Sequence, residues 1–443
     1  MSDSTKISVF WFRRDLRLED NAGLYSALKA GGPVLPLFIF DTNILDALED
    51  KADLRVQFIH QELTRLHNEL ADLGSTLLVK VGRPLDVWKE LLNEYRVVSV
   101  YTNHDYEPYA INRDAAVGEM LAAKGGQLHT YKDTVVFEKS EVVKDDGLPY
   151  TVFTPFSRKW RAALKPFYYK SYPTLKYAGA FIKTKPLPIP TLTDIGFNEQ
   201  AFDFPARVVK NEIVAKYTEQ RDFPAINGTS HLGLHLRFGT LSIRKLLAYA
   251  LQRNETFVNE LIWRDFYQQI LFHFPHVVKG AFRKEYDAIE WENDEKKFAA
   301  WCEGRTGYPL VDAGMRELNA TGYMHNRVRM VVASFLTKHL LIDWRWGEAY
   351  FAQKLLDFDL AANNGGWQWA AGSGTDAAPY FRVFNPQLQM ERFDPQMKYV
   401  KKWVPEFGTS KYPNPIVDHS VARTRTLAVY KKCLSEIKQL TLL

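Results

Sequence analysis

The segment NELIWRDFYQQI brings a carboxylate, an indole and a guanidinium together, as Glu260, Trp263 and Arg264. In a helix these residues fall within about one turn, because residues three or four apart share a face. A carboxylate beside a flat aromatic ring suits recognition of a base-like ring by hydrogen bonding and stacking. An amphipathic helix often carries Glu and Trp for packing alone, so this segment does not decide between binding and packing.

A second polar group lies in TGYMHNRVRM and LLDFDL, and it comprises His325, Asn326, Arg327, Arg329, Asp357 and Asp359. An asparagine can present a donor and an acceptor together to a heteroaromatic edge, and an arginine supplies a fixed positive fork. A structural salt bridge between one aspartate and one arginine explains the same residues. The residue types alone leave both interpretations open.

Two further patterns also have more than one interpretation. Thr229 and Ser230 come just before a helical run, where hydroxyls and free N–H groups accept phosphate, although a simple N-cap is the commoner role there. Trp291, Trp344 and Trp367 lie in three separate segments. Buried tryptophan is usually core, and periodicity cannot show whether three of them line up in space.

Length and composition limit the classes of protein to consider. A chain of 443 residues exceeds the usual size of one domain, so two domains are expected. Its two cysteines exclude a disulfide framework and a cysteine-rich metal site, and no metal is expected. The net charge of +5 permits a nucleic-acid partner without requiring one. Neither an apolar run of roughly 18 residues nor a signal pattern occurs, which predicts an intracellular, cytoplasmic protein without a membrane segment.

The N-terminal part alternates apolar strands with helical patterns. Strands are predicted in ISVFWF, VLPLFIF, STLLVKVG and VVSVYTN, and helices over residues 21–32, 54–74 and 83–95. This alternation predicts a Rossmann-like α/β domain with a parallel sheet. The turn after the first strand, FRRDLRLEDN, lacks the G-x-G-x-x-G fingerprint, so a standard dinucleotide site is not expected there.

The C-terminal part has a helical pattern almost to its end. Before it, a proline-rich stretch with weak periodicity predicts a long connector across the surface. We therefore predict an α/β domain over 1–132, a connector over 133–199 and a larger all-α domain over 200–443. Helices of the last domain are predicted over 206–220, 242–253, 257–274, 310–322, 329–341 and 347–356.

Taken together, the motifs resemble the photolyase/cryptochrome flavoproteins, and within that family the bacterial class I members that repair cyclobutane pyrimidine dimers. The resemblance runs from FWFRRDLRLEDN at residues 10–21 to YPNPIVDHSVART near the C-terminus. Its strongest block extends from GYPLVDAGMRELNATGYMHNRVRM through DLAANNGGWQWAAGSG. Motifs of this length and order are highly specific. The resemblance implies an enzyme that acts, as a monomer, on UV-damaged DNA.

By this resemblance the all-α domain binds FAD. The residues that match positions around its phosphates and sugar are Tyr217, Thr229, Ser230, His231, Leu232 and Gly233. Those that match positions around its isoalloxazine and adenine are Asn326, Arg329, Asp357 and Asp359. Asn363 occupies the position that faces flavin N5, where an amide exchanges hydrogen bonds without supplying a charge. Gly365 and Gly366 are expected to let the backbone approach the flavin closely.

The implied reaction is electron transfer. Light excites fully reduced FADH⁻, which donates an electron to the dimer; the cyclobutane ring splits and the electron returns. The lesion must first leave the duplex stack, at a cost of roughly a few kcal/mol. The expected catalytic residues are Glu260, Asn326 and Asn363. Glu260 is expected to bond the polar edge of the dimer, between aromatic walls formed by Trp263 and Trp369. The other residues expected to contact the lesion or the DNA are Asn326, Arg327, Met330 and Arg382.

The same resemblance gives the three separate tryptophans a common role. Trp367, Trp344 and Trp291 match a chain that reduces oxidised flavin by electron relay from the surface, which favours this role over three unrelated core residues. Trp369 lies two residues beyond Trp367, so on a helix the two would point roughly 200° apart and serve opposite sides of the cofactor.

The resemblance also bears on a second, antenna chromophore in the N-terminal domain. Members with a folate antenna carry an Asn-Glu pair in the segment equivalent to HDYEPYAINRD, where this chain has Tyr109 and Ala110. A deazaflavin or a flavin is therefore expected rather than folate, unless the site is empty.

Two related activities are alternatives to dimer repair. A cryptochrome is a light receptor without repair, but this chain keeps the lesion-side residues Glu260, Trp263, Asn326 and Met330. A (6-4) photoproduct photolyase places a second histidine in the region of HNRVRM. His325 alone does not supply the pair that such acid–base chemistry needs.

Overall fold

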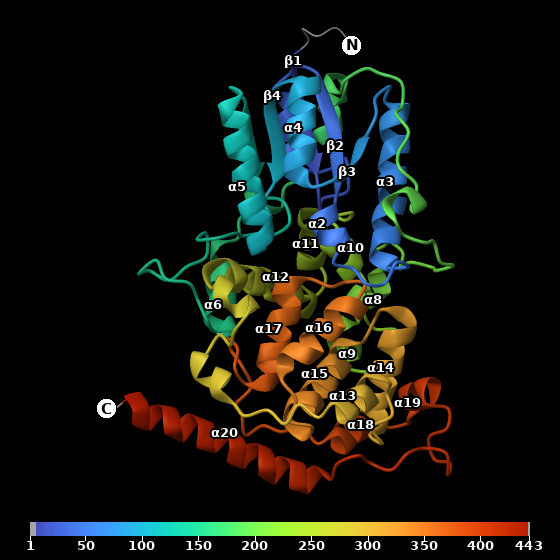
Figure 1. Ribbon diagram of the computed structural model, residues 1–443, viewed down its shortest axis with the longest axis vertical. Coiled ribbons are helices and arrows are strands. Elements are labelled where there is room, and N and C mark those ends of the chain that lie inside the picture. The colour runs from blue at the N-terminus through green and yellow to red at the C-terminus, as the bar shows by residue number, and fades with distance from the viewer. Residues whose placement is uncertain (1–5, 442–443) are drawn as a thin grey trace. The chain divides into compact units, whose positions relative to one another are not determined.

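The computed structural model describes residues 6–441, and it divides into two compact units (Figure 1). Neither unit is continuous in sequence. The first comprises Met1–Glu138, Leu164–Val209 and His231–Gln252, and the second comprises Lys139–Ala163, Lys210–Ser230 and Arg253–Leu443. The predicted domains ended at residues 132 and 199, and the compact units have other borders. Because the compact units are discontinuous in sequence, they do not test these boundaries, which stay predictions.

A five-stranded parallel sheet forms the centre of the first unit, in the order β3-β2-β1-β4-β5. The strands are β1 (Lys6–Phe12), β2 (Val34–Asp41), β3 (Leu78–Gly82), β4 (Arg96–Asn103) and β5 (Gln127–Tyr131). The first four lie in the predicted apolar runs, which confirms the parallel α/β prediction. The edge strand β5 was not predicted, because QLHTY is short and polar, as edge strands often are.

The helices of the first unit are α1 (Ala22–Lys29), α2 (Thr42–Leu45), α3 (Leu54–Asp72), α4 (Pro84–Glu94), α5 (Pro108–Ala123), α7 (Pro166–Tyr169), α10 (Gly233–Arg237), α11 (Ile243–Leu251) and the short turns η1 (Thr174–Ala180) and η2 (Thr193–Ile195). Of these, α1, α2, α4 and α5 contact the strands of the sheet. Trp88 of α4 and Leu121 of α5 pack with Val9 and Trp11 of β1 in one core cluster. The Trp11 and Trp88 ring centroids are 5.5 Å apart, in an edge-to-face arrangement.

A buried ion cluster ties α11 to the sheet unit. Arg244 Nε donates to Asp20 Oδ1 at 2.8 Å and Arg244 Nη2 to Asp133 Oδ1 at 2.7 Å. Arg17 Nη2 also donates to Asp133, at 2.7 Å. Burial raises the pKa of Asp133, but the two guanidiniums outweigh burial and hold this pKa below its usual value. These contacts explain why α11, which was predicted for the helical domain, belongs to the same compact unit as the sheet.

The described part of the second unit is built from helices. They are α6 (Phe153–Ala163), α8 (Asn211–Ala215), α9 (Tyr217–Gln220), α12 (Glu255–His273), η3 (Pro275–Val278), η4 (Lys284–Ala288), α13 (Glu295–Cys302), α14 (Pro309–Thr321), α15 (Asn326–Ser334), η5 (Phe335–His339), α16 (Trp344–Lys354), α17 (Leu360–Ala371), α18 (Pro386–Phe393), α19 (Lys398–Trp403) and α20 (His419–Thr441). The all-α prediction is confirmed. The helix predicted over 329–341 is divided, since α15 passes into η5, a π-helical turn.

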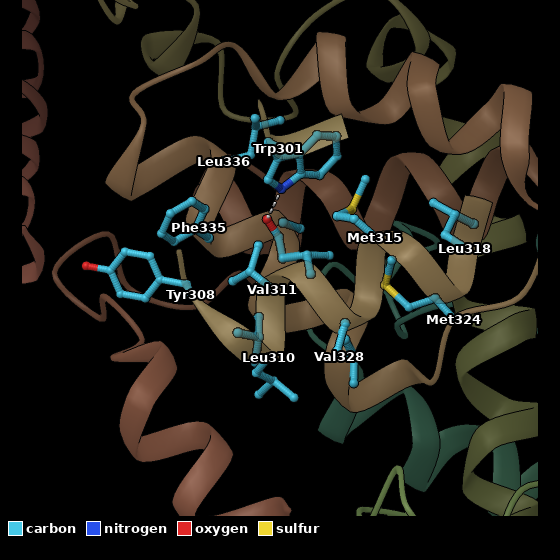
Figure 2. Close-up of a cluster of buried hydrophobic side chains, with 14 of the residues drawn as sticks. Trp301, Tyr308, Leu310, Val311, Met315, Leu318, Met324, Val328, Phe335 and Leu336 are labelled. Atoms are coloured by element: carbon cyan, nitrogen blue, oxygen red, sulfur yellow. Dashed lines mark hydrogen bonds between the residues drawn. The ribbon is translucent and has the colours of Figure 1, made fainter. Parts of the chain in front are cut away.

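Trp301 lies in the main core of this unit (Figure 2). Its side chain is fully buried, and its Nε1–H donates to the carbonyl of Val332 at 3.1 Å. The bond leaves no unsatisfied polar atom on the indole. The core thus fixes α13 against α15, the helix that carries several candidate site residues.

Candidate functional site

Glu260 lies on α12, which begins where the Asn254 side chain accepts the N–H of Phe257 at 3.0 Å. The Glu260 carboxylate pairs with Arg221, and 31% of the Glu260 side chain remains exposed. Burial raises the pKa of Glu260, and the attraction of Arg221 only partly offsets this. Its second carboxylate oxygen accepts no hydrogen bond from the described chain. That oxygen is available to an incoming donor.

Arg221 is part of a series of neighbouring ion pairs. Asp222 lies 3.8 Å from Arg221 and 2.7 Å from Arg327. We call Glu260, Arg221, Asp222 and Arg327 the Glu260 ion-pair chain. It joins α12 to the start of α15, where Arg327 also lies 3.9 Å from the Met330 sulfur. The structure therefore brings together Glu260, Arg327 and Met330, which lie far apart in the sequence.

Trp263 is part of an aromatic stack. Its ring lies 3.6 Å from that of Phe153, at an interplanar angle of 2°, and 5.5 Å from that of Tyr267. Phe153 comes from α6, in the part of the chain that was predicted to be a connector. Stacking on both neighbours fixes the plane of the indole. A flat, fixed indole one turn from Glu260 is suited to packing against a planar ligand.

Trp369 and Arg382 meet at Phe384. The Trp369 ring centroid is 6.4 Å from that of Phe384, and the Arg382 guanidinium lies 5.3 Å above the same ring. Trp369 is half-buried and Arg382 is exposed. An exposed guanidinium beside aromatic rings suits a nucleic-acid strand, because it can pair with phosphate.

Arg329 and Asp357 form the main ion pair among the residues expected around the flavin. Arg329 Nη2 lies 3.0 Å from an Asp357 oxygen, and its Nε donates to the carbonyl of Met324 at 2.7 Å. Tyr323, under the Arg329 guanidinium, bonds through its hydroxyl to Thr229 Oγ1 at 2.9 Å. This links Thr229 to the Arg329–Asp357 pair.

Asp359 and Asn363 are placed by the first turn of α17. Asp359 is the N-cap, since its side chain accepts the N–H of Ala362 at 3.3 Å, and it also accepts from Gln268 at 2.9 Å. The Asn363 amide nitrogen donates to the carbonyl and carboxylate of Glu348, at 3.1 and 2.8 Å. This fixes which way the amide points. Its oxygen accepts no hydrogen bond from the described chain.

The stretch from Thr229 to Gly233 is divided between the compact units. Thr229 and Ser230 belong to the second unit, and His231, Leu232 and Gly233 belong to the first. Tyr217 is largely buried in the second unit. The simple N-cap interpretation of Thr229 and Ser230 is wrong, because α10 starts at Gly233 and its N-cap is Leu232, which offers no capping side chain.

The residues of the second unit fit a flavin in three respects. The Asn363 side-chain oxygen is a neutral acceptor that receives no hydrogen bond from the described chain. It can therefore accept a hydrogen bond from a protonated ring nitrogen of the flavin. The Arg329–Asp357 pair offers both charges to a polar heteroaromatic edge. A side-chain carbon added at Gly366 would meet nothing within 4 Å, which leaves room for close approach. The expectation for Gly365 is wrong, since an added carbon there would lie 2.3 Å from the Tyr267 ring.

The three separate tryptophans lie on neighbouring elements. Trp367 and Trp344 are each 2% exposed in one core cluster, and Trp291 is half-buried against it. An added side-chain carbon at Gly347, one turn after Trp344, would lie 2.1 Å from the Trp367 ring, so α16 packs closely against that indole. The N–H of Glu292 donates to the carbonyl of Leu341 at 2.8 Å. This bond holds the segment of Trp291 beside the start of α16.

Sequence patterns did not indicate three side chains that adjoin these groups. They are Arg221, Phe153 and Trp301, whose ring centroid is 6.0 Å from that of Trp367. Arg221 is 39 residues from its partner Glu260, so no local spacing relates them. The one signal available for Arg221 was its charge, directly after the run YTEQ at residues 217–220. A positive charge there could have been matched with the predicted lesion-side carboxylate of Glu260.

The described residues contain neither a membrane-spanning helix nor a metal-binding cluster. Within residues 6–441 no helix is both long and apolar enough to span a membrane. Over the same residues, no group of three or more His, Cys, Asp or Glu side chains could hold a metal ion.

Comparison with known proteins points to one family. Residues 8–176 match the family model of DNA photolyase, and residues 257–411 match that of the FAD binding domain of DNA photolyase. The deoxyribodipyrimidine photo-lyase of Halobacterium salinarum is 38% identical, over 96% of this chain and 99% of its own length. The class III photolyase structure from Agrobacterium tumefaciens has a TM-score of 0.85 at 34% identity, covering 98% of this chain and 99% of its own. The photolyase of Sulfolobus tokodaii, solved with two FAD molecules, has a TM-score of 0.81 at 36% identity, covering 96% and 100%.

Proposed function

The chain belongs to the DNA photolyase family, and from that membership we propose that it repairs cyclobutane pyrimidine dimers in UV-damaged DNA by light-driven electron transfer. The observation that supports this most is that the second unit holds the Glu260 ion-pair chain, the Trp263 stack and the Asn363 amide. The first two suit a flipped-out planar lesion, and the third suits a flavin.

The lesion is held by residues of α12, α15 and α17. Glu260 accepts a hydrogen bond from the polar edge of the dimer, and Trp263 and Trp369 pack against its rings. Asn326, at the exposed start of α15, bonds the same edge, with Met330 one turn further on. Arg327 and Arg382 pair with phosphates of the damaged strand, so binding weakens as salt is added.

Cofactor binding falls to a different set of residues. Arg329, Asp357, Asp359 and Asn363 hold the ring systems of FAD, and Tyr217, Thr229 and Ser230 of the same unit hold its phosphates and sugar. When bound, FAD supplies a light-driven electron to the dimer and recovers it after the ring has split. Trp291, Trp344 and Trp367 carry electrons inward from the surface.

Light-dependent repair by the purified holoprotein tests the function. The protein is photoreduced and then given an oligonucleotide with a single thymine dimer, under near-UV light or in the dark. We expect intact pyrimidines to be restored in the light only. No repair by the reduced, FAD-loaded protein would contradict the proposal and favour a cryptochrome-like receptor.

Asp357→Asn is expected to weaken FAD binding by about tenfold, because Arg329 loses its charged partner and a hydrogen bond to a charged group contributes ~1.5–3 kcal/mol. The measurement is the ratio of flavin to protein absorbance after dialysis. Glu406→Gln is the matched control, since it breaks the Arg316–Glu406 pair of the same unit, which has an N–O distance of 2.7 Å. Equal flavin loss in both variants would contradict the assignment.

Repair of (6-4) photoproducts is a weaker candidate. His325 Nδ1 accepts the N–H of Arg327 at 3.1 Å and so caps α15. Burial lowers the pKa of His325 to about 4, which keeps the ring neutral near pH 7. A neutral capping histidine without a second histidine at Met330 is not suited to donate a proton to a lesion.

The finer points of assembly and antenna are also proposals. We propose that the protein acts as a monomer, because one chain supplies every lesion-side and relay residue named above, and that it acts in the cytoplasm. An antenna, if bound, is a deazaflavin or a flavin. Tyr109 supports this proposal over a folate antenna, because it stands where folate-binding members carry their Asn-Glu pair. Its hydroxyl donates to Asp41 at 2.6 Å. An absorption spectrum of the purified protein would reveal any second chromophore.

A further inference from the structure

Lys338 is a buried lysine without a carboxylate partner. Its residue is 1% exposed, and its Nζ donates to the main-chain carbonyl of Arg382 at 2.9 Å. No Asp or Glu of the described chain pairs with it. Lysines are almost never fully buried unless they are paired, because an unpaired buried ammonium is costly. Packing alone does not explain a lysine at this place.

The main chain around Lys338 is firmly held. The residue lies in η5, and π-helical turns frequently occur at functional sites. The Thr426 hydroxyl of α20 donates to the carbonyl of Lys338, and Arg425 donates to the carbonyl of His339. The side chain therefore reaches Arg382 from a fixed base.

The segment that carries Arg382 has few other anchors. Residues 372–385 connect α17 to α18, and Arg382 is exposed within them. The ring of Tyr380 stacks on that of Tyr430, at a centroid distance of 5.9 Å. In the described chain, the bond from Lys338 is the only hydrogen bond from outside this segment to the main chain of residues 377–384.

We propose that Lys338 is a positioning residue for DNA binding: its buried ammonium holds the main chain at Arg382, so that the guanidinium meets the lesion strand in one orientation. The inference rests on the proposed function, in which Arg382 pairs with a phosphate of that strand. Lys338 does not touch DNA itself and acts through Arg382.

The charge of Lys338 links this contact to pH. Burial lowers the pKa of Lys338, and the Arg382 charge lowers it further, to about 8. Burial lowers the pKa of the adjacent His339, and it also lowers the pKa of His419, which bonds to His339, so both imidazoles stay neutral above pH 7. A phosphate bound at Arg382 favours protonated Lys338, so its pKa is higher in the complex. The affinity for dimer-containing DNA is therefore full below pH 8, where Lys338 is protonated. It falls as the pH rises through about 8 and Lys338 loses its proton.

Lys338→Met tests the role, because methionine keeps most of the stem and removes the ammonium. We expect dimer-containing DNA to bind about tenfold more weakly at pH 7, as for the loss of one hydrogen bond to a charged group. FAD content and thermal midpoint are measured on the same sample, and FAD content should not change. Lys402→Met, at an exposed lysine 4.8 Å above the Trp403 ring, is the control for the loss of one positive charge.

A double-mutant cycle separates positioning from general stability. In an Arg382→Ala background Lys338→Met should weaken binding no further, because the residue acts through Arg382. An equal loss in both backgrounds would overturn the proposal. The proposal would also be overturned if the affinity of the wild-type protein for dimer-containing DNA were constant from pH 7 to 9.5. This measurement uses no variant, so it does not depend on whether a variant folds. Wild-type protein that bound dimer-containing DNA no better than undamaged DNA would refute the proposed function, and this role with it.

Discussion

Trp291→Phe is expected to slow photoreduction of the bound flavin by about tenfold or more, equivalent to ~1.4 kcal/mol on the barrier. Trp291 is the half-buried member of the three tryptophans, so in the proposed relay it is the residue that an external reductant meets first. Phenylalanine preserves an aromatic ring there but is much harder to oxidise than tryptophan. The measurement is the rate of flavin bleaching under blue light with a thiol reductant.

Two comparisons distinguish an electron relay from damage to the core. Trp403→Phe changes another partly buried tryptophan that packs on the same cluster, and it should photoreduce at the wild-type rate. Trp291→Phe protein that has been chemically reduced beforehand should repair dimers normally, because the relay only restores the reduced flavin. Normal photoreduction of Trp291→Phe would show that the relay assignment is wrong.

Glu260→Ala is expected to lower the rate of dimer repair by roughly 10- to 100-fold, as for the loss of a hydrogen bond to a charged group. The flavin content should stay the same, because Glu260 belongs to the ion-pair chain and not to the Arg329–Asp357 pair. Repair is measured on reduced holoprotein under constant light. Glu255→Ala, on the exposed first turn of the same helix, is the matched control.

The pH dependence of repair gives a second measure of this role. Burial raises the pKa of Glu260, so its carboxylate takes up a proton at a higher pH than an exposed glutamate. If the ionised form is the acceptor, repair is full above that raised pKa and falls as the pH is lowered through it. Glu260→Gln should lack this acid limb. An identical acid limb in Glu260→Gln would assign it to another group.

The sequence predicted most of the fold because both periodicities were strong. Apolar runs gave β1 to β4, and helical spacing gave most of the second unit. The edge strand β5 carried no such signal, because its sequence QLHTY is short and polar. The passage of α15 into η5 was equally hidden, since one continuous apolar pattern covers residues 329–341.

Much of the candidate site depended on family motifs rather than on local spacing. Spacing placed Glu260 near Trp263, but it could not relate Glu260 to Arg221, because their pairing depends on tertiary structure. For the same reason Phe153 was assigned to a connector although it stacks on Trp263. Gly365 was misinterpreted because a close neighbour of a glycine can be a side chain of the protein, here Tyr267.

The ion cluster of Asp20, Asp133 and Arg244 has a consequence for synthesis on the ribosome. The two aspartates emerge early, but Arg244 follows more than a hundred residues after Asp133. Until it arrives, Asp20 lacks its guanidinium partner, and a buried carboxylate without one is strongly disfavoured. The N-terminal residues therefore cannot complete this buried ion cluster by themselves. Nascent chains should complete it only after the connector and the first helices of the second half have left the exit tunnel.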